Sequence, residues 1–327
     1  MARVGSFPTP DELNVCFAHV AYQMAARFAA RGTGIRHAQA WNRDELLAAL
    51  PHADVLVVSG LWRNDLLDRA PRLRFVQSIG AGYNQFDLDA LRARGIRLAS
   101  ASGVNRVAVS EHAIALMLGL ARQLHTGRDH QRRHHWRQMI GDLAAREDEL
   151  AGKTVGIIGA GSIGGRVARL AKAFEMHVIA TRRDAARAVA HVDQLLPTSR
   201  LAELLAAADF VVLTCPLTDE TRNIIDGAAL GRMKPSAFLV NVARGACVDE
   251  SALLEALGAG RIAGAALDTF VDEPLAGDSP FWDLDNVLIT PHTAGETRRY
   301  EENVLDILMA NLDRLGRGEP ALVNQIA

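Results

Sequence analysis

The sequence predicts an α/β protein built from two domains, each with a parallel sheet. Short apolar segments alternate with helical patterns along the 327-residue chain, as expected where helices connect parallel strands. A glycine-rich turn, Gly159-Ala-Gly-Ser-Ile-Gly164, lies near the middle of the chain, between an apolar run and a helical pattern. A chain of this length is also long enough for two domains of ordinary size.

Composition places the chain among globular proteins and excludes several functional classes. The net charge of −2 and the pI near 6.6 give no reason to expect nucleic acid or an anionic membrane as a partner. No apolar stretch approaches the roughly 18 residues of a membrane span, and the first ten residues lack a signal-peptide core. The three scattered cysteines indicate reduced thiols, and we therefore expect a cytoplasmic protein.

Apolar runs predict the strands. Three are expected early, at 13–18, 54–58 and 73–77, with a helix over 21–31. A second series of six begins after residue 152, which is the strand count of a complete dinucleotide-binding fold. These six strands are expected at 154–158, 177–180, 210–214, 237–242, 263–267 and 287–289.

The central glycine turn has the pattern and the context of a dinucleotide-binding turn, because a strand precedes it and a helix follows it. Gly159 permits the tight turn, Gly161 lets a pyrophosphate approach the backbone, and Gly164 allows close packing of helix and strand. The helix start at Ser162 and Ile163 offers free N–H groups to phosphates. A glycine turn that binds nothing is the structural alternative.

The end of the second strand favours NADPH over NADH. An acidic residue there bonds the ribose of NAD, but this strand ends in Thr181-Arg182-Arg183, and Asp184 comes three residues late. A carboxylate would repel a 2′-phosphate, whereas an arginine fork binds one. We expect NADP(H) as the cofactor, with NAD(H) as the alternative. An ordinary solvated arginine pair is the structural alternative.

Two long helical patterns, 109–123 and 297–315, flank the second series of strands without belonging to it. We therefore expect a discontinuous substrate-binding domain, 1–103 and 293–327, around an NAD(P)-binding domain, 104–292. Both would be Rossmann-like or flavodoxin-like folds, with the active site in the cleft between them.

Three late segments each place a polar side chain where a predicted strand ends. Arg244 follows the run 237–240, Glu273 follows 264–267, and His292 follows 287–289. The carboxyl ends of parallel strands are where ligands bind in open sheets. The sequence therefore predicts that an arginine, a glutamate and a histidine meet at one edge.

The ordered set of motifs resembles the D-isomer-specific 2-hydroxyacid dehydrogenase family, which includes glyoxylate/hydroxypyruvate reductases. The resemblance runs from about Val76 to Gly295. Its elements are Ser78-Ile-Gly-Ala-Gly82, Asn105 with Glu111, the glycine turn, Cys215-Pro-Leu-Thr218 with Glu220-Thr221, and the segments of Arg244, Glu273 and His292.

This resemblance implies a role for each site residue. Arg244 would bind the substrate carboxylate and polarise the keto oxygen, His292 would be the general acid, and Glu273 would orient its imidazole and favour its protonated form. The backbone N–H groups of one loop would hold the carboxylate, and several residues would lie at the cofactor. The loop is Ile79, Gly80 and Ala81; the cofactor residues are Cys215, Pro216, Ala243 and His292, with Asp268 near the nicotinamide carboxamide.

Other signals receive a structural interpretation. His130 and His134 have a spacing that can bind a metal, but no acidic or cysteine ligand completes the set, and we expect a solvated helix face over 125–137 and no metal. Trp136 ends that stretch. In the family this region packs on a second subunit, which implies a homodimer with Trp136 at the contact. Leu61 and Trp62 follow a strand, and we expect them to lie either in the cleft or on the surface.

The function predicted from the sequence is NAD(P)H-dependent reduction of a small 2-keto acid, of the glyoxylate or hydroxypyruvate type, to the D-2-hydroxy acid. A dehydrogenase for a bulkier 2-keto acid is one alternative. The phosphoglycerate branch is disfavoured because many members carry a further C-terminal domain, and formate dehydrogenase because its site departs from the Glu/His pair. A non-catalytic dinucleotide-sensing corepressor on the same fold is the second alternative.

Overall fold

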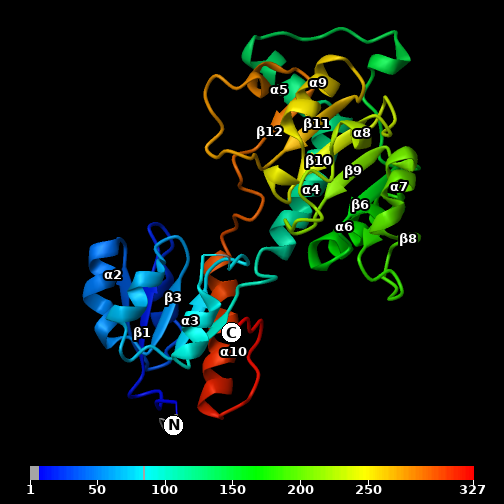
Figure 1. Ribbon diagram of the computed structural model, residues 1–327. Helices are drawn as coiled ribbons and strands as arrows, with labels where there is room; N and C mark the ends of the chain where they lie inside the picture. Colours follow the sequence, from blue (N-terminus) through cyan, green and yellow to red (C-terminus); the bar gives the residue numbers. More distant parts are fainter. Residues whose placement is uncertain (1–6, 84) are drawn as a thin grey trace. The chain divides into compact units, whose positions relative to one another are not determined.

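The computed structural model describes residues 7–83 and 85–327 and divides the chain into two compact units. The first unit joins Met1–Asn105 to Thr297–Ala327, and the second unit is Arg106–Glu296. The blue, cyan and red parts of the ribbon therefore make the first unit, and the green to orange part makes the second (Figure 1). The sequence put each crossing a few residues earlier in the chain, at 103/104 and 292/293.

The first unit contains a five-stranded sheet in which all neighbouring strands are parallel. The strand order, β2-β1-β3-β4-β5, is that of flavodoxin-like folds. The strands are β1 (Asn14–Ala18), β2 (Arg36–Ala40), β3 (Val55–Val58), β4 (Phe75–Ser78) and β5 (Arg97–Ala99).

Helices cover both faces of this sheet, because successive strand residues enter two different apolar cores. Val15 and Phe17 of β1 pack in one core with α1 and α10, whereas Cys16 and Ala18 pack in the other with α2 and α3. The C-terminal helix is thus part of this first unit (Figure 1). The helices are α1 (Met24–Ala29), α2 (Arg43–Ala49), α3 (Leu88–Ala93) and α10 (Tyr300–Gly316), with the 3₁₀ segments η1 (Leu50–His52) and η2 (Asn64–Arg69).

The second unit contains a seven-stranded parallel sheet of order β12-β11-β10-β9-β6-β7-β8. From β8 to β11 this is the doubly wound Rossmann order, and β12 adds one strand at the edge. The strands are β6 (Thr154–Ile158), β7 (His177–Arg182), β8 (Gln194–Pro197), β9 (Phe210–Leu213), β10 (Phe238–Asn241), β11 (Gly264–Leu267) and β12 (Val287–Ile289).

Helices α4 and α6 pack against one face of this sheet, and α7, α8 and α9 against the other. No helix in the described part of the chain combines the length and the apolarity needed to cross a membrane. The helices are α4 (Arg106–Ala121), α5 (Leu124–Arg132), α6 (Ser162–Ala173), α7 (Leu201–Ala207), α8 (Gly227–Leu230) and α9 (Glu250–Gly258), with the 3₁₀ segments η3 (Leu143–Ala145), η4 (Thr198–Arg200), η5 (Gly245–Cys247) and η6 (Pro280–Asp283).

The predicted fold class, an α/β protein with two parallel sheets, is confirmed. The strand count of the second sheet was wrong, because the sheet has seven strands rather than six. The strands missed in the two sheets are β2, β5 and β8, all at sheet edges. Four of the five residues of β2 are charged, polar or alanine residues that are not buried, so the strand lacks the apolar run that marks a central strand.

The helix predicted over 125–137 was too long. Helix α5 ends at Arg132, and His134 has a φ of 53°, which a helix does not accommodate. Trp136 consequently lies beyond the helix and is 91% exposed. The preceding helix ends at Ala121 because Gln123 also adopts a left-handed conformation, with φ 48°.

Candidate active site

The segment after β10 forms a turn that is held by a buried asparagine. Asn241 is 1% exposed; its Oδ1 accepts from the N–H of Ala243 at 3.0 Å, and its Nδ2 donates to the carbonyl of Arg244 at 3.0 Å. Both bonds fix the backbone around Arg244, whose side chain stays exposed. Its guanidinium donates to the carbonyl of Ala243 at 2.7 Å.

Gly245 brings this turn against the segment that carries Glu273. A Cβ atom at Gly245 would lie 1.9 Å from the carbonyl carbon of Phe270, so any side chain would push the two segments apart. In that segment, the N–H of Phe270 donates to Glu273 Oε1, at 3.0 Å. Close backbone packing therefore connects the arginine to the glutamate.

Glu273 and His292 form a hydrogen bond in which Glu273 Oε2 lies 2.7 Å from His292 Nδ1. The side chains are 36% and 47% exposed, so a ligand can reach the imidazole. Burial by itself raises the pKa of Glu273, but the hydrogen bonds from His292 and Phe270 and the charges of His292 and Arg244 outweigh it, and the pKa lies below its ordinary value. Glu273 is therefore an anion that orients the ring and leaves Nε2 as the nitrogen open to a ligand.

His292 is held in a left-handed conformation, with φ 53°, by the end of β11. Its N–H donates to the carbonyl of Asp268 at 2.8 Å. The Asp268 carboxylate, 1% exposed, accepts from the Thr290 hydroxyl at 2.6 Å and from the N–H groups of Thr293 and Ala294 at 2.9 and 3.0 Å. Backbone and side chain of one aspartate thus fix both sides of the histidine.

His112 of α4 completes this arrangement, and the sequence analysis did not find it. Its Nε2 lies 3.0 Å from Thr290 Oγ1 and 3.6 Å from Asp268 Oδ1. Because the Thr290 hydroxyl gives its hydrogen to Asp268, it can only accept from His112, which fixes the proton of that ring on Nε2. The adjacent Glu111 was noted as a motif residue, but nothing in the spacing indicates where His112 reaches.

The glycine turn has the shape that a dinucleotide requires. Gly159 has φ 102°, and its Cβ position is filled by the backbone of Cys215 at 2.7 Å; the Cβ position of Gly164 is filled by the carbonyl of Gly159 at 2.4 Å. At Gly161, by contrast, nothing lies within 4 Å. That open space at the start of α6 is where a pyrophosphate can approach N–H groups that no side chain caps.

The other predicted cofactor residues lie around this turn or at strand ends of the same sheet. The carbonyl of Thr181 accepts from Gly159 and Ala160 at 3.2 and 2.9 Å, so it supports the turn from the end of β7. Among the described residues, Arg182 and Arg183 have no ion pair or side-chain hydrogen bond. The Cys247 thiol and burial together raise the pKa of Cys215, which therefore stays protonated.

The profile of the family described as "D-isomer specific 2-hydroxyacid dehydrogenase, NAD binding domain" matches residues 114–294. The chain belongs to the D-isomer specific 2-hydroxyacid dehydrogenase family. The family predicted from the sequence is therefore confirmed.

Relatives of this dehydrogenase family member carry two different names. The chain is 38% identical to a glyoxylate reductase of Pyrococcus furiosus over 292 residues, which is 86% of each protein. It is 39% identical to a D-3-phosphoglycerate dehydrogenase of Mycobacterium tuberculosis over 264 residues, or 80% of this chain, but this match spans 49% of that protein. A solved structure of a family protein from Aeromonas salmonicida is 30% identical, with a TM-score of 0.83, and the alignment covers 97% of this chain and 99% of that one.

The predicted substrate loop lies in the first unit, directly after β4, and one of its three residues needs a correction. The N–H of Ile79 donates to the carbonyl of Val58 at 3.0 Å, so it is not available to a substrate. The N–H groups of Gly80 and Ala81 make no hydrogen bond to another described residue.

The predicted location was also wrong for Trp62, which is 1% exposed and packs on Phe86. Leu61, by contrast, lines a cavity of about 490 Å³.

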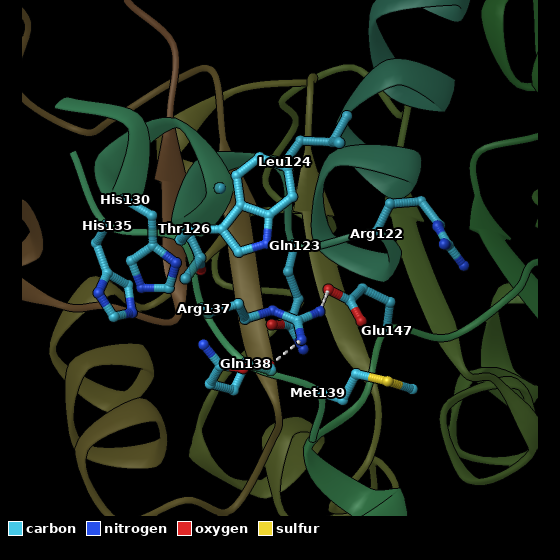
Figure 2. A pocket seen from close by; sticks show the side chains of 12 residues that line it. Arg122, Gln123, Leu124, Thr126, His130, His135, Arg137, Gln138, Met139 and Glu147 are labelled. Carbon is cyan, nitrogen blue, oxygen red and sulfur yellow. Dashed lines mark hydrogen bonds and ion pairs between the residues drawn. The ribbon is translucent and has the colours of Figure 1, made fainter. Parts of the chain in front are cut away.

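A second cavity is lined by neither Arg244 nor His292. It measures about 500 Å³ and is formed by α5 and the segments on either side of it (Figure 2). Leu124, Trp136 and Met139 line it and are 60%, 91% and 97% exposed. Arg137 pairs with Glu147 inside it. Among the described residues, no group of three or more histidine, cysteine, aspartate or glutamate side chains could hold a metal ion.

Proposed function

We propose that this protein catalyses NAD(P)H-dependent reduction of a small 2-keto acid, of the glyoxylate or hydroxypyruvate type, to the D-2-hydroxy acid. The observation that carries the proposal is the hydrogen bond between Glu273 and His292, at 2.7 Å, on the segment that packs against the Arg244 turn. The relative named glyoxylate reductase, matched over 86% of both chains, supports this substrate class.

Each residue then has a role that its chemistry fits. Arg244 binds the substrate carboxylate through its planar fork and polarises the keto oxygen. His292, with Nδ1 held by Glu273, donates the proton on Nε2 to that oxygen as the carbonyl carbon receives hydride. A bound nicotinamide supplies the hydride. The N–H groups of Gly80 and Ala81 hold the substrate carboxylate, and the remaining acceptor capacity of Asp268 serves the carboxamide.

Two other functions use the same residues. A bulkier 2-keto acid requires only a larger pocket, and the match to D-3-phosphoglycerate dehydrogenase keeps this alternative open. A dinucleotide-sensing corepressor would keep the glycine turn but would need no proton donor. Such a corepressor can retain Arg244, Glu273 and His292, so turnover of a 2-keto acid is what distinguishes it from an enzyme.

A panel of 2-keto acids tests the function directly. With NADPH or NADH, monitored at the nicotinamide absorbance, we expect the highest kcat/KM for glyoxylate or hydroxypyruvate and a D product where the carbon is chiral. His292→Asn should lower kcat by roughly 10²–10⁴-fold, the usual contribution of a general acid.

The control for this prediction is His177→Asn, an exposed histidine at the start of β7. Turnover should be unchanged in that variant. Near-full activity of His292→Asn would exclude the proposed proton donor. Dinucleotide binding without turnover of any keto acid would favour the corepressor.

Replacing Glu273 with glutamine should shift the pH dependence of reduction. The variant lacks the negative charge that favours the protonated imidazole, so the alkaline fall in kcat/KM should move to lower pH. In the native enzyme the pKa of Glu273 lies below its ordinary value of 4.5. Its ionised form therefore contributes to stability above that pH, and the contribution is lost as the pH falls through the lowered pKa. Glu255→Gln, at an exposed position of α9, is the control, and an identical pH profile for both variants would contradict the role of Glu273.

We propose NADPH as the preferred cofactor. Arg182 ends β7 and Arg183 follows it; neither has an anionic partner among the described residues, and a 2′-phosphate would supply one. Arg182→Asp should lower the ratio of kcat/KM for NADPH to that for NADH by about tenfold or more, because a carboxylate repels the phosphate. The control is Arg169→Asp, an exposed arginine on α6. A ratio that stays constant in Arg182→Asp would rule out this site.

We also propose a homodimer formed through the exposed face of Leu124, Trp136 and Met139. Apolar side chains this exposed and adjacent to one another are typical of protein interfaces. Sedimentation should give twice the 35.3 kDa chain mass for the native protein and a single chain mass for Trp136→Asp. Val20→Asp, at a 67% exposed position in the other unit, should stay dimeric. A native monomer would refute the proposal.

We infer that the protein works in a reducing compartment such as the cytoplasm. All three cysteines are free and buried, and none forms a disulfide.

A further inference from the structure

In the loop that follows β4, the carbonyl groups of Ile79 and Gly80 accept hydrogen bonds, whereas the N–H groups of Gly80 and Ala81 donate none to the described residues. The carbonyl of Gly80 accepts from the N–H of Ala101 and from the hydroxyl of Ser78, both at 3.0 Å. The same hydroxyl lies 3.4 Å from the carbonyl of Gly82. The N–H groups of Gly80 and Ala81 donate to no other described residue. Successive free N–H groups of this kind form a concave site for an anion.

Two bonds fix Ile79, the first residue of this loop. The N–H of Ile79 donates to Val58 on the neighbouring strand, and the carbonyl of Ile79 accepts from the hydroxyl of Tyr300 at 3.0 Å. In a planar trans peptide the carbonyl and the following N–H point in opposite directions. The bond from Tyr300 therefore directs the N–H of Gly80 away from the Tyr300 hydroxyl, and no described residue accepts from this N–H.

Tyr300 comes from a distant part of the sequence. It is the first residue of α10 and lies 221 residues from Ile79. Its ring is 9% exposed and packs against the ring of Tyr22, with centroids 5.0 Å apart. Both partners of the bond belong to the first unit, so the contact is local to that unit. The packing fixes the ring, and the ring fixes the hydroxyl.

We propose that Tyr300 is a positioning residue for substrate binding, which orients the Gly80 N–H toward the carboxylate of the 2-keto acid. The inference rests on the proposed function for the identity of the substrate. Loss of the hydroxyl would let the peptide between Ile79 and Gly80 rotate, because no other described donor bonds the carbonyl of Ile79. The cost would fall on carboxylate binding and not on the cofactor.

The variant Tyr300→Phe removes this hydroxyl and keeps the ring. We expect the KM for glyoxylate and the inhibition constant of oxalate, a carboxylate that cannot be reduced, to rise by about 5- to 20-fold, the loss of one hydrogen bond. The KM for the nucleotide should change less than about twofold, and Tm should fall by no more than about 5 °C. Tyr22→Phe, which removes the neighbouring hydroxyl, is the matched control.

A second measurement does not depend on turnover or on the variant. In protein labelled with ¹⁵N-glycine, oxalate should shift the amide resonance of Gly80 in the native chain. The inference is overturned if that resonance does not respond, or if Tyr300→Phe retains the native oxalate affinity. A native protein that binds oxalate at Gly80, more tightly than Tyr300→Phe, but reduces no 2-keto acid would refute the proposed function and leave this inference standing.

Discussion

The candidate site depends on one buried carboxylate. Asp268 is 1% exposed and accepts hydrogen bonds from Thr290, Thr293 and Ala294, so it joins the ends of β11 and β12. Without it, the N–H group of the buried Ala294 would have no acceptor, which costs about 1–3 kcal/mol. The left-handed conformation of His292 between these donors is strained for a residue with a side chain, and the carboxylate is what compensates for it.

Close backbone packing adds a second constraint, and it explains why two positions, Gly245 and Gly159, require glycine. Gly245 needs no positive φ, but the backbone of Phe270 occupies the place of its Cβ. At Gly159 both the backbone conformation and the close contact require glycine, because its φ is 102° and Cys215 lies against it. Gly161 has open space instead, and this difference separates a glycine that serves packing from one that admits a ligand.

The sequence predicted what local pattern encodes. The buried central strands were found because apolar runs mark them, and Arg244, Glu273 and His292 were found because they follow such runs. Edge strand β2 was missed because its residues are mostly exposed. The end of α4 was misplaced because a glutamine such as Gln123 gives no indication of a left-handed φ. Trp62 was assigned to the cleft or the surface because a position after a strand does not reveal burial.

His112 and Tyr300 lay beyond sequence reasoning for another reason. Each acts through a partner that is more than 170 residues away in the chain: His112 bonds Thr290 across 178 residues, and Tyr300 bonds Ile79 across 221. No periodicity relates such positions, and only the folded chain brings them together. Residues that position a site are therefore harder to predict than those that contact its ligand, because strand ends mark the latter.

The two carboxylates near His292 have different roles because they differ in burial. Asp268 is enclosed and bonded to three donors of fixed geometry, so it serves as a rigid acceptor for the loop. Glu273 is 36% exposed and faces an ionisable ring, and the hydrogen bonds and charges around it hold its pKa below the ordinary value. An anion in that position accepts from Nδ1 and orients the imidazole. Exchanging the two environments would leave the loop without its acceptor and the histidine without the group that orients it.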